Sequence, residues 1–186
     1  VRSAPRPHVL PVRSLAGPAS PFRAGWLLEP LLAGPGADLI VSRRTFGRPV
    51  RRLYRSTLIH GDEPAGPLAA LELLHQNQWP EATDLSLWPC LNPTGFPLNH
   101  RENAEGVDLN RDYRHSESAE VRAHIAWLER QPAYDCTLCL HEDWESNGFY
   151  LYELNPDDRP SLAAKMIEAV SAVCPIDLAE LIEDRP

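Results

Sequence analysis

Apolar and polar positions along the chain predict strands and helices in turn from Arg51 onward. Residues 51–59 (RRLYRSTLI) alternate as a half-buried strand does, and residues 67–76 (PLAALELLHQ) repeat apolar positions at the 3.6-residue spacing of a helix. A second strand is predicted at residues 85–92 (LSLWPCLN). The predicted order in this part of the chain is therefore strand, loop, helix, strand.

The second half of the chain continues the alternation. Residues 118–131 (SAEVRAHIAWLERQ) have the pattern of an amphipathic helix with a serine near its N-terminal cap. Strands are predicted at residues 134–142 (YDCTLCLHE) and 149–154 (FYLYEL), and a helix is predicted within residues 155–174. Strands that alternate with helices indicate an α/β fold, with a mixed, largely parallel sheet flanked by helices.

The first 50 residues differ from the rest because prolines and glycines divide them into short pieces. Residues 25–34 (GWLLEPLLAG) are predicted to form a helix that ends at Gly34, and residues 1–50 are interpreted as a proline-rich lead-in packed on the domain. With 186 residues, 43% of them hydrophobic, the chain is long enough for one core. Residues 1–186 are therefore predicted to form a single domain.

Charge and hydropathy exclude some classes of partner. A formal net charge of -8 disfavours nucleic acid, whose binding proteins present basic surfaces. No apolar run reaches the roughly 18 to 20 residues that span a bilayer, so no membrane association is expected. Residues 1–11 lack the apolar stretch of a signal peptide, which favours a cytoplasmic protein. The chain does not begin with Met, so the loss of an upstream piece stays open.

Two of the four cysteines, Cys136 and Cys139, form a C-x-x-C pair inside the strand predicted at residues 134–142. Residues three apart on a strand point to opposite faces, which is wrong for a shared metal cage. Packing in the core is therefore favoured over a redox or metal role. A reducing compartment fits this interpretation.

Residues with metal-binding side chains follow two of the predicted strands. His60 and Glu63 come directly after the strand at residues 51–59, and His141 ends the strand that begins near Tyr134. Because ligands gather at the carboxyl ends of parallel strands, all three are expected at one edge of the sheet. Two imidazoles and one carboxylate are a ligand set of catalytic zinc sites, which keep one position open for water. The other histidines are interpreted as surface or packing residues: His8, His75, His100, His115 and His124.

A long polar segment at residues 92–113 follows the strand at residues 85–92 and brings Arg101 and Arg111 to the same predicted edge. A loop of this length inside a compact domain is uncommon and is usually functional or disordered. We therefore expect this segment to belong to the site.

Four motifs, HGDEPAG, NPTGF, RENAEGVDLNRDY and CLHEDW, resemble in this order the zinc-binding and substrate-binding motifs of the M14 metallocarboxypeptidases. The H-x-x-E pair alone is weak evidence because it recurs by chance, whereas its combination with GVDLNR and a later strand-end histidine is specific. The resemblance covers residues 51–154. It implies a zinc-carboxypeptidase-like fold of the phosphorylase/hydrolase-like type, with one zinc ion per chain held by His60, Glu63 and His141.

The same resemblance implies roles for four further residues. Asp108 matches an acid that accepts a hydrogen bond from the first ligand histidine; the alternative is a loop aspartate that bonds its own backbone. Arg101 matches the arginine that polarises the scissile carbonyl and stabilises the oxyanion. Asn110 and Arg111 match the pair that grips the terminal carboxylate of the substrate. The implied activity is zinc-dependent hydrolysis of a C-terminal peptide bond, on a peptide or amino-acid conjugate with a free carboxylate.

The general base of the family, a glutamate on a later strand, has no match in this sequence. Glu142 and Glu145 lie too close to His141, and Glu180 and Glu183 lie in a tail that reads as helix and loop. The resemblance therefore implies that the chain lacks its C-terminal strands and that the base lies beyond Pro186. A degenerate enzyme that binds zinc without turnover is the other interpretation.

His141 is followed by Glu142 and Asp143, which departs from the His-Ser-Tyr of digestive carboxypeptidases and favours the small bacterial and cytosolic branches.

Three alternatives to a carboxypeptidase remain open. A deacylase of the succinylglutamate desuccinylase or aspartoacylase type shares the histidine-glutamate motif and D-x-N-R, although NPTGF and HEDW favour the peptidase. The others are a zinc-binding, non-catalytic module and an α/β domain without metal.

Overall fold

The computed structural model describes residues 25–34 and 37–179, so predictions for residues 1–24 and for the tail from Glu180 lie outside the described residues. The chain divides into two compact units, the first ending at Glu142 and the second beginning at Asp143. The first unit contains the sheet and the candidate site. A single domain over residues 1–186 stays a prediction.

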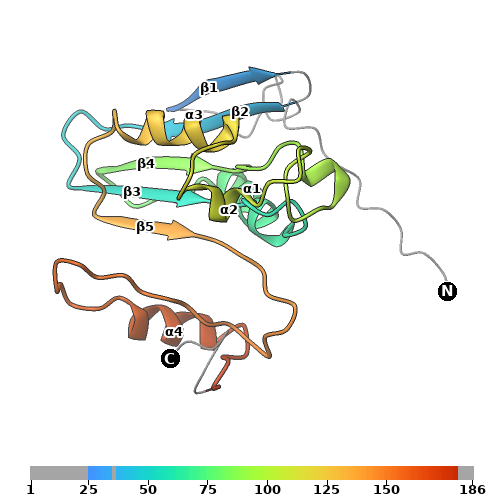
Figure 1. Ribbon diagram of the computed structural model, residues 1–186. Coiled ribbons are helices and arrows are strands. Elements are labelled where there is room, and N and C mark those ends of the chain that lie inside the picture. The colour runs from blue at the N-terminus through green and yellow to red at the C-terminus, as the bar shows by residue number, and fades with distance from the viewer. Residues whose placement is uncertain (1–24, 35–36, 180–186) are drawn as a thin grey trace. The chain divides into compact units, whose positions relative to one another are not determined.

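The sheet of the first unit has its described strands in the order β1-β2-β4-β3-β5 (Figure 1). β3 runs parallel to β4 and β5, whereas β2 runs antiparallel to β1 and β4. The predicted α/β fold with a mixed sheet is therefore confirmed, and its parallel strands are those that lead to the candidate site. The strand bounds are β1 (Trp26–Gly34), β2 (Ala37–Arg44), β3 (Arg51–Ser56), β4 (Thr83–Trp88) and β5 (Cys136–Cys139).

Helices cover both faces of this sheet (Figure 1). The helix α1 (Ala65–Gln76) connects β3 to β4 and packs on one face, in a small core with Leu87. The helix α3 (Ala119–Leu128) packs on the other face, where Trp127 meets Trp88 edge to face with ring centroids 5.2 Å apart. Successive residues of a strand point to opposite faces, so Leu87 and Trp88 serve the two cores separately.

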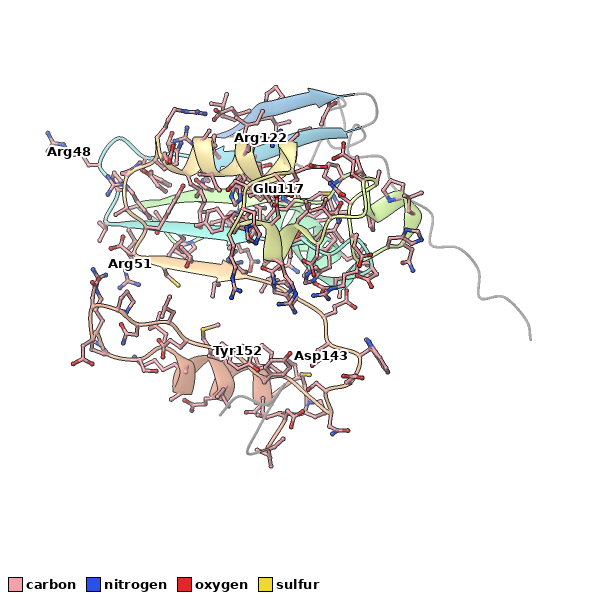
Figure 2. The ribbon with its side chains drawn as sticks, in the orientation of Figure 1. Arg48, Arg51, Glu117, Arg122, Asp143 and Tyr152 are labelled. Carbon is pink, nitrogen blue, oxygen red and sulfur yellow. The ribbon has the colours of Figure 1, made fainter. Side chains whose placement is uncertain are left out.

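The start of α3 confirms the serine cap expected from the sequence. Ser118 has extended backbone angles, and its Oγ accepts a hydrogen bond from the backbone N–H of Val121 at 3.2 Å. Figure 2 shows Glu117 and Arg122 at this end of the helix, where the Arg122 guanidinium donates to the Glu117 carbonyl. The helix therefore begins where its sequence provides acceptors for its first free N–H groups.

The prediction of a helix at residues 25–34 is wrong, because these residues form β1 and pair antiparallel with β2. An apolar run of this length does not distinguish a buried helix from a strand by periodicity. Pro30 lies at a register shift between Pro30 and Leu32, on the outermost described strand, where its missing N–H is tolerated. The lead-in therefore extends the sheet instead of only packing on it.

The prediction of a strand at residues 149–154 is also wrong. In the second unit, Phe149 makes a single parallel bridge to Ile176, and residues 150–154 join no ladder within the described part of the chain. Alternating aromatic and polar residues favour a strand, but a strand forms only where a partner extends the pairing. The helix predicted within residues 155–174 is present as α4 (Ala163–Ser171).

The four cysteines are all free. Cys90 is buried and Cys136 is half-buried, but Cys139 is exposed, so packing in the core is a wrong prediction for Cys139. None of the helices in the described part of the chain has the length and apolar character needed to cross a membrane.

Candidate metal and substrate site

The site lies at the carboxyl ends of the parallel strands. β3 and β5 pair in parallel up to Ser56 and Cys139, and the segments that follow them carry His60 and His141. Figure 2 shows Arg48 and Arg51 at the other, amino-terminal end of β3. The structure thus brings the two histidine-bearing segments to one edge of the sheet, as expected for ligand sites in parallel sheets.

Glu63 forms the centre of the candidate metal cluster. Nδ1 of His60 donates to Oε1 of Glu63 over 2.5 Å, and Nδ1 of His141 donates to Oε2 over 3.1 Å. One potential ligand atom from each of the three residues lies within 4.8 Å of the other two. His60 and Glu63 are buried, whereas the side chain of His141 is 35% exposed. The cluster is therefore accessible from the His141 side.

The charge of Glu63 is stabilised by its neighbours. Burial raises its pKa, but the hydrogen bonds from His141 and His60 outweigh burial and lower the pKa to about 2. The carboxylate is therefore ionised at neutral pH, with a ring nitrogen of each histidine directed at it. This is a suitable electrostatic environment for a cation.

The backbone between His60 and Glu63 is fixed by close contact with the polar segment. The Gly61 N–H donates to the Arg101 carbonyl at 3.3 Å. A Cβ at Gly61 would lie only 2.4 Å from the Gly95 carbonyl carbon and 2.5 Å from the His100 oxygen. Only glycine permits this approach.

Asp108 connects the first histidine to both arginines. Its Oδ1 lies 3.4 Å from Nε2 of His60, and its Oδ2 accepts from Nε of Arg101 at 3.1 Å and lies 3.7 Å from Nε of Arg111. The backbone N–H groups of Asn110 and Arg111 also donate to Oδ1. Both interpretations of Asp108 thus have structural counterparts, since it caps the short helix α2 (Leu109–Asp112) and faces His60.

The charge of Asp108 is also stabilised. Burial raises its pKa, but the backbone N–H of Arg111 and the positive charge of Arg101 lower the pKa below the usual aspartate value. Asp108 is therefore negative at neutral pH, when it faces His60 and holds the Arg101 guanidinium.

The three residues expected to contact substrate all lie beside Asp108. The side chains of Arg101 and Arg111 are 42% and 77% exposed, so both guanidinium groups remain available to a ligand. Asn110 and His141 line one cavity of about 330 Å³. This volume falls within the usual range of small-ligand sites.

Buried asparagines order the long polar segment. The Asn92 side chain accepts from the Gly95 N–H at 2.8 Å and donates to the Arg101 carbonyl at 3.2 Å. The Asn103 Oδ1 accepts from the N–H of Val107 at 2.9 Å. The segment is therefore built by internal hydrogen bonds that place Arg101 and Asp108, which agrees with the functional interpretation of its length.

The cluster passes a chemical test for a metal site. It offers two imidazole nitrogens and one ionised carboxylate, which are preferred zinc ligands. The buried Nε2 of His60 has no hydrogen-bond partner among the described residues, and Asp108 Oδ1 is the acid that faces it. A small approach of Asp108 would complete the carboxylate-histidine pair that accompanies metal ligands.

Two contributions to the site were missed by reasoning from the sequence. Glu142, weighed only as a base, accepts through Oε1 from the backbone N–H of Ala65 and so ties the end of β5 to the start of α1. His124, interpreted as a packing residue, connects two tyrosines beside the cavity. The sequence feature that could have indicated this role is a polar residue on the buried face of α3, three residues after Val121.

Comparisons with known proteins agree with this geometry. The chain is 31% identical over 104 residues to Carboxypeptidase SOL1 from Arabidopsis thaliana, a match that covers 45% of this chain and 21% of that protein. A crystal structure from Shewanella denitrificans OS217, named as a metallopeptidase, matches with TM-score 0.72 and 28% identity over 87% of this chain and 63% of that chain. No protein-family model matches.

Two further structures share this fold at lower TM-scores. A metallo-carboxypeptidase from Pseudomonas aeruginosa, in complex with (2-guanidinoethylmercapto)succinic acid, matches with TM-score 0.53 and 26% identity, over 62% of this chain and 35% of that chain. An aspartoacylase family protein from Mesorhizobium loti matches with TM-score 0.52 and 23% identity, over 66% of this chain and 42% of that chain, which shows the fold alone.

The predicted resemblance to metallocarboxypeptidases is therefore confirmed in sequence and in fold. The chain spans less than two thirds of the length of these relatives.

Proposed function

We propose that the chain carries the zinc-binding and carboxylate-binding residues of a metallocarboxypeptidase, which hydrolyses a C-terminal peptide bond and releases the C-terminal amino acid. The observation that supports this best is that the candidate metal ligands and both arginines lie together at one edge of the sheet. His60, Glu63 and His141 lie together there, and Asp108 links His60 to the guanidinium groups of Arg101 and Arg111. The similarity to metallocarboxypeptidases and the M14-like motifs support the same activity.

The proposed cofactor is one zinc ion per chain, held by Nδ1 of His60, Nδ1 of His141 and the carboxylate of Glu63. Both Nδ1 atoms already face Glu63. Zinc in such a site polarises a carbonyl group and lowers the pKa of water. Asp108 would orient the His60 ring through Nε2 and raise its basicity.

Arg101 and Arg111 are assigned different parts of the substrate. Arg101 is held by Asp108 with its guanidinium partly exposed, and it would donate to the oxygen of the scissile carbonyl, where negative charge develops. Arg111 and Asn110 would bind the terminal carboxylate, because a guanidinium fork matches a carboxylate with two parallel hydrogen bonds. Glu142 is engaged with the Ala65 N–H, so it is not assigned the role of general base.

The test compares two peptides of the same sequence, one with a free C-terminus and one amidated. The complete protein loaded with Zn²⁺ should release an amino acid from the free peptide only, because Arg111 needs a carboxylate partner. Equal cleavage of both peptides would contradict the role of Arg111. Zinc binding without cleavage of either would instead favour a non-catalytic module.

The alternative activity is deacylation of N-acyl amino acids. It is supported by the histidine-glutamate motif and D-x-N-R, which such deacylases share, and an aspartoacylase family protein has the same fold. The same purified protein should be offered an N-acetyl amino acid beside the free peptide. Hydrolysis of the acyl amino acid with no peptide cleavage would establish this alternative.

We also infer a cytoplasmic setting, with a peptide or amino-acid conjugate as partner and no nucleic acid or membrane. The four free cysteines support a reducing compartment, and the net charge of -8 disfavours nucleic acid. Fractionation of cells followed by detection of the protein tests the compartment.

A further inference from the structure

His124 is a buried histidine that the proposed reaction does not use. It lies in α3 with 4% of its surface exposed, and both ring nitrogens have tyrosine partners. Nε2 lies 2.8 Å from the Tyr54 hydroxyl, and Nδ1 makes a short hydrogen bond with the Tyr113 hydroxyl. A neutral imidazole has one N–H donor and one acceptor nitrogen, so it can satisfy both hydroxyl groups at once.

The network is neutral at physiological pH. Burial lowers the pKa of His124 to about 4 and raises the pKa of both tyrosines. The Trp88 ring packs edge to face on the imidazole, with centroids 4.7 Å apart. The imidazole is therefore held both by packing and by two hydrogen bonds.

Tyr113 makes this network relevant to the site. It is the C-terminal cap of α2, and it directly follows the four residues that include Asn110 and Arg111. A helix of four residues is not stable by itself, so its placement depends on what holds its ends. Asp108 holds the N-terminal end by accepting from two backbone N–H groups.

Two sets of contacts hold the C-terminal end, the hydrogen bonds that Asp112 accepts from residues 117 and 118 and the hydrogen bond of Tyr113. One joins Asp112 to the Ser118 hydroxyl at 2.6 Å, which links α2 to the start of α3. The other joins Tyr113 through His124 to Tyr54, which lies on β3, the strand that leads to His60. The second contact connects α2 to the sheet by hydrogen bonds, beside the packing of Leu109 in the core cluster that contains Tyr54. Its three residues line the same cavity as Asn110 and His141.

We propose that His124 is a positioning residue, which fixes Tyr113 and thereby sets Asn110 and Arg111 for the carboxylate of the substrate. This inference rests on the proposed carboxypeptidase function. Rotation of α2 would move the Arg111 fork relative to the cluster, and a displacement of about 1 Å in such a group is enough to weaken binding or catalysis strongly.

The two ring nitrogens can be replaced separately. The amide group of Asn is as many bonds from Cβ as Nδ1 of His is. His124→Asn therefore keeps a hydrogen-bond partner for Tyr113 and loses the hydrogen bond with Tyr54. The amide group of Gln is as many bonds from Cβ as Nε2 of His is. His124→Gln therefore keeps the hydrogen bond with Tyr54 and loses the one with Tyr113. Both variants lose the ring packed on Trp88, which matches them for stability.

The test measures KM and kcat on N-benzoylglycyl-phenylalanine, the Tm, and the bound Zn²⁺ of the protein and both variants. We expect a similar fall in Tm and full zinc content in both. KM should rise about tenfold in His124→Gln, the effect of losing roughly one hydrogen bond, and change less than about threefold in His124→Asn. Tyr113→Phe should reproduce the rise, and Tyr54→Phe should not.

Equal KM values in the two His124 variants, with the wild type active, would overturn the inference and leave the proposed function standing. A wild-type protein that holds zinc but neither cleaves nor binds this dipeptide would overturn the proposed function and the inference with it. If the wild type holds zinc and binds the dipeptide without cleaving it, the dissociation constant from titration replaces KM, and equal values in the two His124 variants overturn the inference in the same way.

Discussion

Gly61→Ala should damage the candidate metal site while leaving the rest of the sheet intact. Gly61 stands between His60 and Glu63, with its backbone against the polar segment that carries Arg101. The alanine Cβ would lie 2.4 Å from the Gly95 carbonyl carbon, whereas ordinary contacts begin at 3.4 Å. The obstacle is backbone, so no side chain can rotate away.

The magnitude follows from that overlap. Relief requires the two backbones to separate by about 1 Å, and overpacking of this kind costs typically 1–3 kcal/mol of unfolding free energy. The same shift moves His60 relative to Glu63. We expect Zn²⁺ affinity to fall between about tenfold and a hundredfold, the range seen when groups that orient metal ligands are disturbed.

The assay is competition for Zn²⁺ against a chelator of known affinity, together with urea denaturation of the metal-free protein. Gly47→Ala is the matched control, because a Cβ at Gly47 meets nothing within 4 Å. Its zinc affinity and stability should equal those of the wild type. If Gly61→Ala also binds zinc like the wild type and unfolds at the same urea concentration, the close packing argued for this loop is refuted.

Further predictions concern the groups around the cluster. Asp108→Asn should weaken Zn²⁺ binding about tenfold to a hundredfold, since it removes the carboxylate that faces His60; an unchanged dissociation constant in the chelator assay would contradict this. Burial lowers the pKa of His124 from 6.5 to about 4, so its stabilising contribution is complete above pH 6.5 and is lost as the pH falls towards 4. Urea denaturation at pH 7 and pH 4 should therefore show the wild type losing roughly 3 kcal/mol more than His124→Gln, and parallel losses would argue against a buried neutral ring.

The sequence was sufficient to predict the parallel core of the fold and the edge at which chemistry gathers. β3 and α1 follow the expected pattern because the period of their apolar positions is clear, whereas β4 is a short apolar run that is buried on both faces of the sheet. The meeting of His60 with His141 follows from strand polarity alone. It needs no knowledge of side-chain packing.

The elements that were mispredicted depend on whether a partner strand pairs with them, which their own periodicity does not reveal. β1 is a strand because β2 pairs with it and accommodates Pro30 at a register shift, which no local pattern encodes. Residues 149–154 have the composition of a strand, but Phe149 alone makes a bridge. The link from Tyr113 to Tyr54 through His124 was equally hidden, because hydrogen bonds between side chains become visible only after the helices are docked.

Because β5 pairs with β3 across a long stretch of chain, we expect the candidate metal centre to form late in folding. His60 and Glu63 belong to the β3-α1-β4 unit, which forms from neighbouring segments, whereas His141 lies 78 residues beyond Glu63. Closing so long a loop is slow and entropically costly. A metal ion that binds all three residues would therefore act as a cross-link on the most distant strand pairing. Zinc should slow hydrogen exchange in β5 more than in β4, because the cofactor would also stabilise the pairing of β5 with β3.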